Sequence, residues 1–425
     1  MNILVIGRGG REHSLIQKLA ESKQADKIFA APGNAGMEEV AERVAIPETD
    51  QKKLVTFAKE NGVDLTIVGP ENPLLEGVVD IFQSAGLKVF GPTYAAAMIE
   101  GSKHFAKQIM SKYEIPTADY QAFTNLEAAK GYIREKGAPI VVKADGLAAG
   151  KGVVVADKVE EALKAAEDML EKGQFGEASK EIVVEEFLQG EEFSLMAFVN
   201  GANVYPMIPA KDHKRAFEGD HGPNTGGMGA FAPVPELPEA DYQTAVESIL
   251  KPAADALVEE GRPFTGILYA GLIQTDKGPK VIEFNARFGD PETQVVLPLL
   301  ENDLVQVIVD VLNEKDPELR WADKTCAGVV VASSGYPGGY EKGRPVPVVS
   351  GKTHVYTVHA GTEISEHGYV SSGGRVLLVG AVENSLPQAL EEVYEHLQMF
   401  EGNKDFYYRR DIGISSISST HPYVK

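Results

Sequence analysis

Two oxygen-bearing side chains, Glu283 and Asn285, stand two residues apart in a segment that also carries Arg287. On an extended chain this spacing points both side chains the same way. Mg²⁺ prefers a few hard oxygen ligands and leaves its other positions to water and phosphate. The pattern therefore predicts a divalent-metal site beside a guanidinium, suited to a bound nucleotide, the alternative being a strand with an ordinary polar face.

A glycine-rich segment from Gly146 to Gly152 follows the apolar run that ends at Lys143. Its Gly-Lys pair is similar to a P-loop, but Gly152 replaces the metal-binding hydroxyl and Val153–Val155 favours a strand where a P-loop needs a helix. We interpret it as a hairpin flap whose backbone N–H groups close over a triphosphate, with Lys143 as a fixed positive charge. An ordinary glycine-rich hairpin is the alternative.

The segment from Glu185 to Glu192 ends one apolar strand and leads to another, which predicts a hinge between two lobes. Backbone groups at such a hinge can read adenine, and the carboxylate of Glu191 or Glu192 can accept hydrogen bonds from ribose hydroxyls. Taken alone, the segment is also typical of an acidic turn.

Near the N-terminus, Gly7 and Gly9 follow a strand and open a helix, whose first turn can bind an anion. Glu12 stands where a dinucleotide site requires Gly or Ala, and the next strand ends without an acidic residue, so NAD is disfavoured. A single phosphate neutralised by Arg8 or Arg11 fits better. A tight strand-to-helix turn is the alternative.

A long polar, glycine-rich segment, residues 211–230, is costly in a compact domain unless it binds something. Asp212 and the backbone amides could hold a small zwitterion. His213 suggests a general base, although an isolated loop histidine is more often structural.

Apolar periodicity predicts the elements that position these residues. The first hundred residues alternate strand and helix patterns, as expected of an open parallel sheet. Strands are expected at residues 3–6, 27–30, 65–68, 88–90, 140–143, 152–155, 182–185, 193–199, 266–275 and 280–284. Helices are expected from Ser102 to about Tyr113 and near residues 159–172, 240–260, 293–313 and 386–399.

The chain is therefore expected to be an α/β protein in four parts. They are an N-terminal open parallel α/β sheet (1–115), a small α+β lobe with the flap (116–192), a large lobe with the metal site (193–325) and a small β-rich domain (326–425). Several domains are expected because 425 residues exceed what one core usually supports.

Composition excludes several classes of function. A net charge of -21 argues against a nucleic-acid partner, because such binding relies on Lys and Arg. The single cysteine, Cys326, excludes a disulfide framework and a multi-thiolate metal site and favours a cytosolic, cytoplasmic setting. No segment is long and apolar enough for a signal peptide or membrane span, so no membrane partner is expected.

In this order, the flap after Lys143, the hinge from Glu185 to Leu188 and the Glu283–Asn285 pair resemble the ATP-grasp ligases, whose two lobes hold ATP between them. Further motifs extend the resemblance over essentially the whole chain to the glycinamide ribonucleotide synthetases. These motifs are residues 7–13, 69–74, 211–215, 224–229, 285–292 and 408–413.

The resemblance implies that ATP phosphorylates the carboxylate of glycine and that the amine of 5-phosphoribosylamine attacks the glycyl phosphate. The products would be an amide, ADP and phosphate, in an early step of purine synthesis. Such chemistry needs a metal ion, Lys and Arg, but no protein nucleophile. Because the amine is unstable, a transient contact with the preceding pathway enzyme is a further hypothesis.

The resemblance also assigns roles to residues. Glu283 and Asn285 would hold Mg²⁺ or Mn²⁺, and Arg287 and Asp212 would be catalytic. ATP would be bound by Lys103, Lys143, Gly146, Gly150, Lys151, Gly152, Glu185, Glu186, Phe187, Leu188 and Glu192. Glycine and phosphoribosylamine would be bound by Gly9, Gly10, Arg11, Gly33, Asn34, Pro70, Glu71, Asn72, Thr225, Gly226, Gly227, Met228 and Arg287.

One departure and three alternatives accompany these assignments. Many ATP-grasp enzymes carry a further acidic metal ligand on the neighbouring strand, but Leu268–Ile273 offers none. The nearest alternative is an ATP-grasp ligase for another carboxylate, such as a carboxyaminoimidazole ribonucleotide synthetase or a biotin carboxylase. A nucleotide sensor without turnover and a dehydrogenase are the others.

Overall fold

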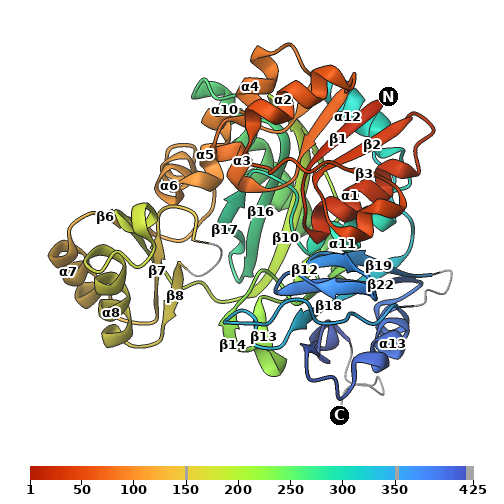
Figure 1. Cartoon of the computed structure of the whole chain (residues 1–425). Helices are drawn as coiled ribbons and strands as arrows, with labels where there is room; N and C mark the ends of the chain where they lie inside the picture. Colours follow the sequence, from red (N-terminus) through yellow and green to blue (C-terminus); the bar gives the residue numbers. More distant parts are fainter. Residues whose placement is uncertain (149–151, 350–353, 418–425) are drawn as a thin grey trace.

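An open parallel sheet forms the N-terminal part of the molecule (Figure 1). The computed structural model, which describes residues 1–148, 152–349 and 354–417, orders its strands β3-β2-β1-β4-β5. They are β1 (Asn2–Gly7), β2 (Lys27–Pro32), β3 (Glu42–Arg43), β4 (Leu65–Val68) and β5 (Val89–Phe90). All pairings are parallel, as predicted, and only the two-residue β3 was not expected.

Helices bury both faces of this sheet. Alternate β1 residues enter two different apolar clusters, Leu4 and Ile6 in one, Ile3 and Val5 in the other. The helices are α1 (Gly10–Ala20), α2 (Gln51–Glu60), α3 (Glu71–Leu75), α4 (Val78–Ser84), α5 (Tyr94–Gly101) and α6 (Lys103–Lys112). Parallel pairing sets the carboxyl ends of β1, β2 and β4 at one edge, where the polar loops follow.

The small lobe is a four-stranded antiparallel sheet, ordered β6-β9-β7-β8, with two helices. Its strands are β6 (Tyr120–Phe123), β7 (Ile140–Ala144), β8 (Val153–Ala156) and β9 (Ile182–Glu186). The predicted helix is α8 (Val159–Leu170), and α7 (Leu126–Lys136) was not identified from the sequence. Both helices pack on the face that carries Ile140 and Val142, which leaves Lys143 on the other face.

The large lobe is an antiparallel sheet ordered β11-β10-β16-β17. Its strands are β10 (Glu191–Asn200), β11 (Asn203–Pro206), β16 (Thr265–Thr275) and β17 (Gly278–Asn285). α9 (Glu239–Ala245) continues through a π-helical turn (Val246–Leu250) into α10 (Lys251–Glu259). The helical stretch expected near 293–313 is interrupted: α11 (Glu292–Val296) and a 3₁₀ turn precede α12 (Leu304–Leu312), which Asp303 caps.

The sheet of the last hundred residues also includes strands from the middle of the chain. Its path is β12-β15-β18-β22-β19, and β23 pairs with β18. The strands are β12 (Lys211–Asp212), β15 (Gly229–Ala232), β18 (Thr325–Ser333), β19 (Val355–His359), β22 (Arg375–Glu383) and β23 (Phe406–Tyr407). Two hairpins, β13 (Arg215–Phe217) with β14 (His221–Asn224) and β20 (Thr362–Ser365) with β21 (Gly368–Ser371), lie outside it. The predicted helix is α13 (Leu386–Leu397).

Packing divides the molecule unevenly. One apolar cluster joins Leu4 of the N-terminal sheet, Leu268 of the large lobe and Leu386 of α13. The small lobe has a separate core and stands apart from the other three parts (Figure 1). Within the described residues, no helix is long and apolar enough to cross a membrane. The four-part division by residue number stays a prediction.

Candidate active site between the lobes

The predicted metal pair lies at the end of β17, just before the loop that carries Arg287. Antiparallel pairing sets Gly271 of β16 opposite Glu283. A Cβ at Gly271 would lie 3.2 Å from Cγ of Glu283, so the glycine makes room for the carboxylate. The strand β16 opposite Glu283 thus carries no acidic side chain, and the described residues hold no group of three His, Cys, Asp or Glu side chains suited to a metal.

Glu283 faces several cationic side chains. Burial alone would raise its pKa, but Lys214, Lys143, Lys103 and Arg287 together lower it below its usual value. Glu283 is therefore ionised at neutral pH, the state that a metal ligand requires.

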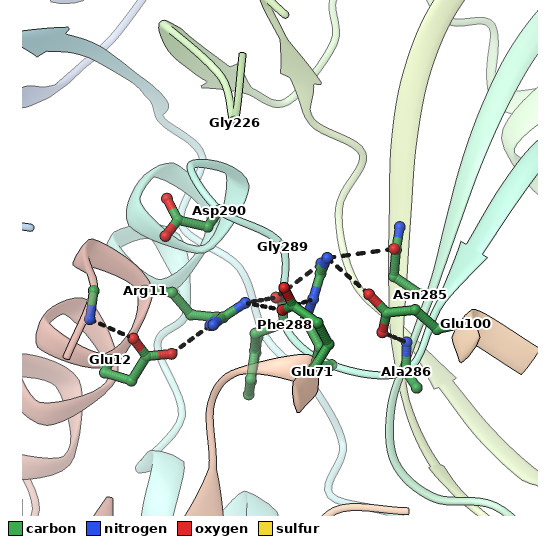
Figure 2. Close-up of polar contacts among 12 residues, drawn as sticks. Arg11, Glu12, Glu71, Glu100, Gly226, Asn285, Ala286, Phe288, Gly289 and Asp290 are labelled. Atoms are coloured by element: carbon green, nitrogen blue, oxygen red, sulfur yellow. Dashed lines mark hydrogen bonds and ion pairs between the residues drawn. The ribbon is translucent and has the colours of Figure 1, made fainter. Parts of the chain in front are cut away.

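Arg287 is held by two carboxylates from other elements (Figure 2). Its guanidinium lies 3.0 Å from Glu100 on α5 and 3.4 Å from Glu71 at the start of α3, and it donates to Oδ1 of Asn285 over 3.3 Å. Glu100 in turn accepts a 2.7 Å hydrogen bond from the N–H of Ala286. These contacts hold the guanidinium of Arg287, the predicted phosphate-binding group, next to Asn285 of the predicted metal pair.

Glu100, which contacts Arg287, was not identified from the sequence. It ends an otherwise apolar helix and is buried, and burial raises its pKa despite the neighbouring Arg287. A lone carboxylate after the run Ala95–Ile99 was the available signal, since acids are rarely buried unless paired.

The N-terminal loop reaches the same loop of the large lobe through Arg11. The Arg11 guanidinium donates to Glu12 over 2.5 Å and to the carbonyl of Phe288 over 3.2 Å, and lies 3.9 Å from Glu71 (Figure 2). Glu12 also accepts a 2.6 Å hydrogen bond from the N–H of Gly9. The predicted phosphoribosyl loop and the predicted phosphoryl-transfer arginine are therefore joined by ion pairs.

The same geometry explains why a dinucleotide pattern is absent. A Cβ at Gly69 would lie 2.0 Å from Oε1 of Glu12, so this side chain fills the space above the strand ends. Asn34 stabilises the loop that follows β2. Its side-chain amide donates to the carbonyls of Arg8 (2.7 Å) and His359 (3.0 Å). In this structure Asn34 positions the loop, because both amide hydrogens are already used.

Asp212 lies in β12, half-buried and paired with Ala230 of β15. Burial raises the pKa of Asp212 to about 7, and the carboxylates of Glu292, Glu192 and Glu283 add to the rise although Lys214 opposes it. A carboxyl with a pKa near neutrality is suited to binding or releasing an ammonium group.

His213 does not suit a general-base role. Its Nε2 accepts a 3.1 Å hydrogen bond from the N–H of Gly413, and its buried Nδ1 has no partner within the described residues. Burial lowers the pKa of His213 to about 4. The histidine therefore anchors the closing segment of the chain to the 211–230 segment.

The 225–228 loop, predicted to bind glycine, is fixed by its own Thr225 and by two side chains of the C-terminal part, Tyr336 and Arg375. Thr225 Oγ1 accepts from the N–H of Gly227 over 3.0 Å. The N–H of Gly226 donates to Tyr336 Oη over 3.0 Å, and Arg375 donates to the Gly226 carbonyl over 2.7 Å. Met228 follows as a fully buried residue.

Arg375 was also missed from the sequence, because a strand arginine gives no local signal. Its guanidinium lies 3.0 Å from the carboxylate of Asp290. Burial raises the pKa of Asp290, but Arg375 and Arg11 lower it below its usual value. The C-terminal part thus contributes to the same loop that carries Arg287.

On the nucleotide side, Lys143 Nζ donates to Glu185 Oε2 (2.9 Å) and to the carbonyl of Ile282 (3.1 Å). Lys103 Nζ donates to the carbonyl of Gly146 over 3.1 Å. Gly150 and Lys151 of the predicted flap lie outside the described residues.

A cavity of about 440 Å³ lies against the hinge. Glu186, Phe187 and Leu188 line it together with the β16–β17 turn. Glu192, the predicted ribose ligand, lies 3.1 Å from Lys214. Pro70 and Asn72 flank Glu71 where α3 begins, Gly10 is the first residue of α1, and Gly33 lies in the loop after β2.

Comparison with known proteins identifies the family. Models of the phosphoribosylglycinamide synthetase N domain, ATP-grasp (A) domain and C domain match residues 1–100, 101–293 and 326–415. A phosphoribosylamine–glycine ligase of Halalkalibacterium halodurans is 55% identical over 98% of this chain and 98% of its own length. This chain belongs to the phosphoribosylglycinamide synthetase family.

Other members of the phosphoribosylglycinamide synthetase family agree in sequence and structure. A phosphoribosylamine–glycine ligase of Listeria innocua is 56% identical over 97% of this chain and 99% of its own length. The crystal structure of a phosphoribosylamine–glycine ligase from Thermotoga maritima is 32% identical, with a TM-score of 0.83 over 97% of this chain and 100% of that one. The resemblance stated from the sequence and the predicted fold class are confirmed.

A more distant structure shows the fold alone. The biotin carboxylase domain of Hydrogenobacter thermophilus 2-oxoglutarate carboxylase is 16% identical, with a TM-score of 0.72 over 96% of this chain and 90% of that one. The fold of this chain is therefore shared with a biotin carboxylase domain.

Proposed function

We infer that this chain is an ATP-dependent carbon–nitrogen ligase of purine biosynthesis. It joins glycine to 5-phosphoribosylamine through a glycyl phosphate and yields glycinamide ribonucleotide, ADP and phosphate. One observation carries the proposal: a single loop connects the predicted sites. In this loop Arg287 links the metal pair to the N-terminal loop through Glu71. Three residues later, Asp290 contacts Arg375, which in turn fixes the 225–228 loop.

Glu283 and Asn285 would hold Mg²⁺ or Mn²⁺. The donor set fits a hard cation, because Glu283 is kept ionised and Oδ1 of Asn285 accepts, among the described residues, a single long hydrogen bond from Arg287. When bound, the ion supplies positive charge to the phosphates.

The residues also fit ATP. Oε1 of Glu185 is buried with no hydrogen-bond partner among the described residues, so an acceptor is available for a donor on the base. Lys143 and Lys103 would contact phosphates, and the hinge residues Glu186 to Leu188 border a cavity.

Arg287 and Asp212 would act on the reacting groups. The ion pairs to Glu100 and Glu71 pre-position Arg287, so its guanidinium can stabilise charge on the transferred phosphoryl group without reorganising. Asp212, when ionised, would hold the glycine ammonium and leave the glycine carboxylate free to attack the terminal phosphorus of ATP, with ADP as the leaving group. The amine of phosphoribosylamine then displaces phosphate from the acyl carbon, and no side chain needs to form a covalent bond.

The test is magnesium-dependent ADP release with glycine, first without and then with freshly generated phosphoribosylamine, and mass detection of the amide. Turnover that requires both substrates is expected. Glu283→Gln should abolish it while the circular dichroism spectrum is unchanged. ADP release supported by bicarbonate instead of glycine would assign the chain to another ATP-grasp reaction. The cytosolic location and the contact with the preceding pathway enzyme stay predictions.

A further inference from the structure

A second lysine, Lys107, lies behind the predicted nucleotide lysine and has no role in the site described so far. It belongs to α6, and its side chain is only 2% exposed. Its Nζ lies 3.2 Å from Oε2 of Glu185, the same oxygen that accepts from Lys143. Two ammonium groups thus share one buried carboxylate oxygen.

Both lysines also connect this carboxylate to the strand that carries the metal pair. Lys143 donates directly to the carbonyl of Ile282. Lys107 donates to Thr117 Oγ1 over 2.8 Å, and that hydroxyl donates to the carbonyl of Val281 over 2.7 Å. The cluster therefore links β9 of the small lobe to β17 of the large lobe.

We propose that Lys107 is a positioning residue for nucleotide binding, which neutralises Glu185 so that the charge of Lys143 remains available to the phosphates of ATP. The proposal rests on the proposed function, because it takes Lys143 as a phosphate ligand.

The net charge of the cluster of Lys107, Lys143 and Glu185 explains why Lys107 would matter. With both lysines protonated, the cluster carries two positive charges and one negative charge, so one positive charge is left for a polyphosphate. Without Lys107, Glu185 and Lys143 form a closed pair with no net charge. A buried charge interacts strongly over short distances, so this difference acts on the phosphates and not on an uncharged base.

Lys107 also gives the cluster a pH dependence. Burial lowers the pKa of Lys107 to about 8, with Glu185 opposing the shift and Lys143 and Lys280 adding to it. The Tyr120 ring lies 5.6 Å from its Nζ. As the pH rises through about 8, Lys107 loses its proton and the cluster loses its surplus charge.

The experiment measures the dissociation constants of ATP, magnesium tripolyphosphate and adenosine for the full chain. Lys107→Met should weaken ATP and tripolyphosphate about tenfold or more and leave adenosine within about twofold, as expected for loss of a charge-assisted contact. Adding Glu185→Gln to Lys107→Met should restore most of the tripolyphosphate affinity, because Lys143 is again unpaired. In the unchanged chain that affinity should fall as the pH rises through about 8, and in Lys107→Met the fall should be clearly smaller; it is not abolished, because burial also lowers the pKa of Lys103.

Two control variants distinguish a failure of the Lys107 role from a failure of the proposed phosphate site. Lys112→Met removes an exposed lysine of the same helix, paired with Glu260, and should change none of the three constants. Lys143→Met should abolish tripolyphosphate binding. If it does not, Lys143 is no phosphate ligand, and this part of the proposed site fails together with the role of Lys107. If Lys107→Met weakens all three ligands equally, or none, while Lys143→Met behaves as expected, the positioning role alone is wrong.

Discussion

At the scale of residues, the site is a set of buried charges whose partners come from different parts of the chain. Arg287 pairs with Glu100 and Glu71, and Asp290 pairs with Arg375. Such pairs contribute little net stability, because the cost of removing ions from water offsets their attraction. Their value here is positional: each fixes a group that would face a substrate.

Asp212 should set the pH dependence of glycine use. Its pKa of about 7 means that the carboxyl is neutral below that pH and cannot hold an ammonium group. We therefore expect kcat/KM for glycine to fall as the pH drops through about 7. In Asp212→Asn the value should be at least about a hundredfold lower and independent of pH in this range. Asp323→Asn, which changes an exposed residue shortly before β18, is the matched control.

The raised pKa of Asp212 should also affect the stability of the fold. Because the folded-state pKa is raised, the folded protein holds this proton more tightly than the unfolded chain, so ionisation costs stability as the pH rises from about 4 to about 7. The melting temperature of Asp212→Asn should decline less over this window than that of the unchanged chain. An equal decline would show that Asp212 titrates normally.

At the scale of elements, the sequence predicts what local periodicity controls. The strands β1, β2, β4 and β5 and the helix α13 were predicted from their short apolar runs and apolar periodicity. The short strand β15 was not, because Gly229–Ala232 becomes a strand only through pairing with β18 almost a hundred residues later. Glu283 and Asn285 were found from spacing, whereas Arg375 acts through tertiary contact alone.

The 225–228 loop, which is predicted to bind glycine, can be tested by substitution of its glycines. Gly227 has φ +110°, and a Cβ there would lie 2.4 Å from Pro291. Gly261 also has positive φ, +69°, but an added Cβ would meet nothing within 4 Å. Gly261→Ala should therefore cost only about 1 kcal/mol of stability and leave the KM for glycine unchanged. Gly227→Ala should raise that KM about tenfold or more, because Pro291 or the loop must move. Equal effects would place the loop away from glycine.

At the scale of the whole molecule, three parts share a core and the small lobe has its own. The Asp290–Arg375 ion pair belongs to the shared body, whereas Lys143 belongs to the separate lobe. Glycine binding and nucleotide binding should therefore respond to different substitutions.

Arg375→Met tests this separation. The change leaves Asp290 without its main partner and frees the Gly226 carbonyl, so we expect the KM for glycine to rise about tenfold or more and the melting temperature to fall. The dissociation constant of ATP should stay within about twofold. Arg344→Met, an exposed arginine of the same part, is the control. A parallel loss of ATP binding would mean that the two lobes are not independent.

Because β15 pairs with a strand that is synthesised almost a hundred residues later, its placement has a consequence for the growing chain. β15 directly follows the 225–228 loop and lies in the sheet between β12 and β18. A growing chain therefore lacks the strand that holds this loop until residues 325–333 have left the ribosome. Tyr336 and Arg375, which fix Gly226, emerge later still. A chain that ends before residue 325 therefore lacks β18, Tyr336 and Arg375, the groups that hold the 225–228 loop.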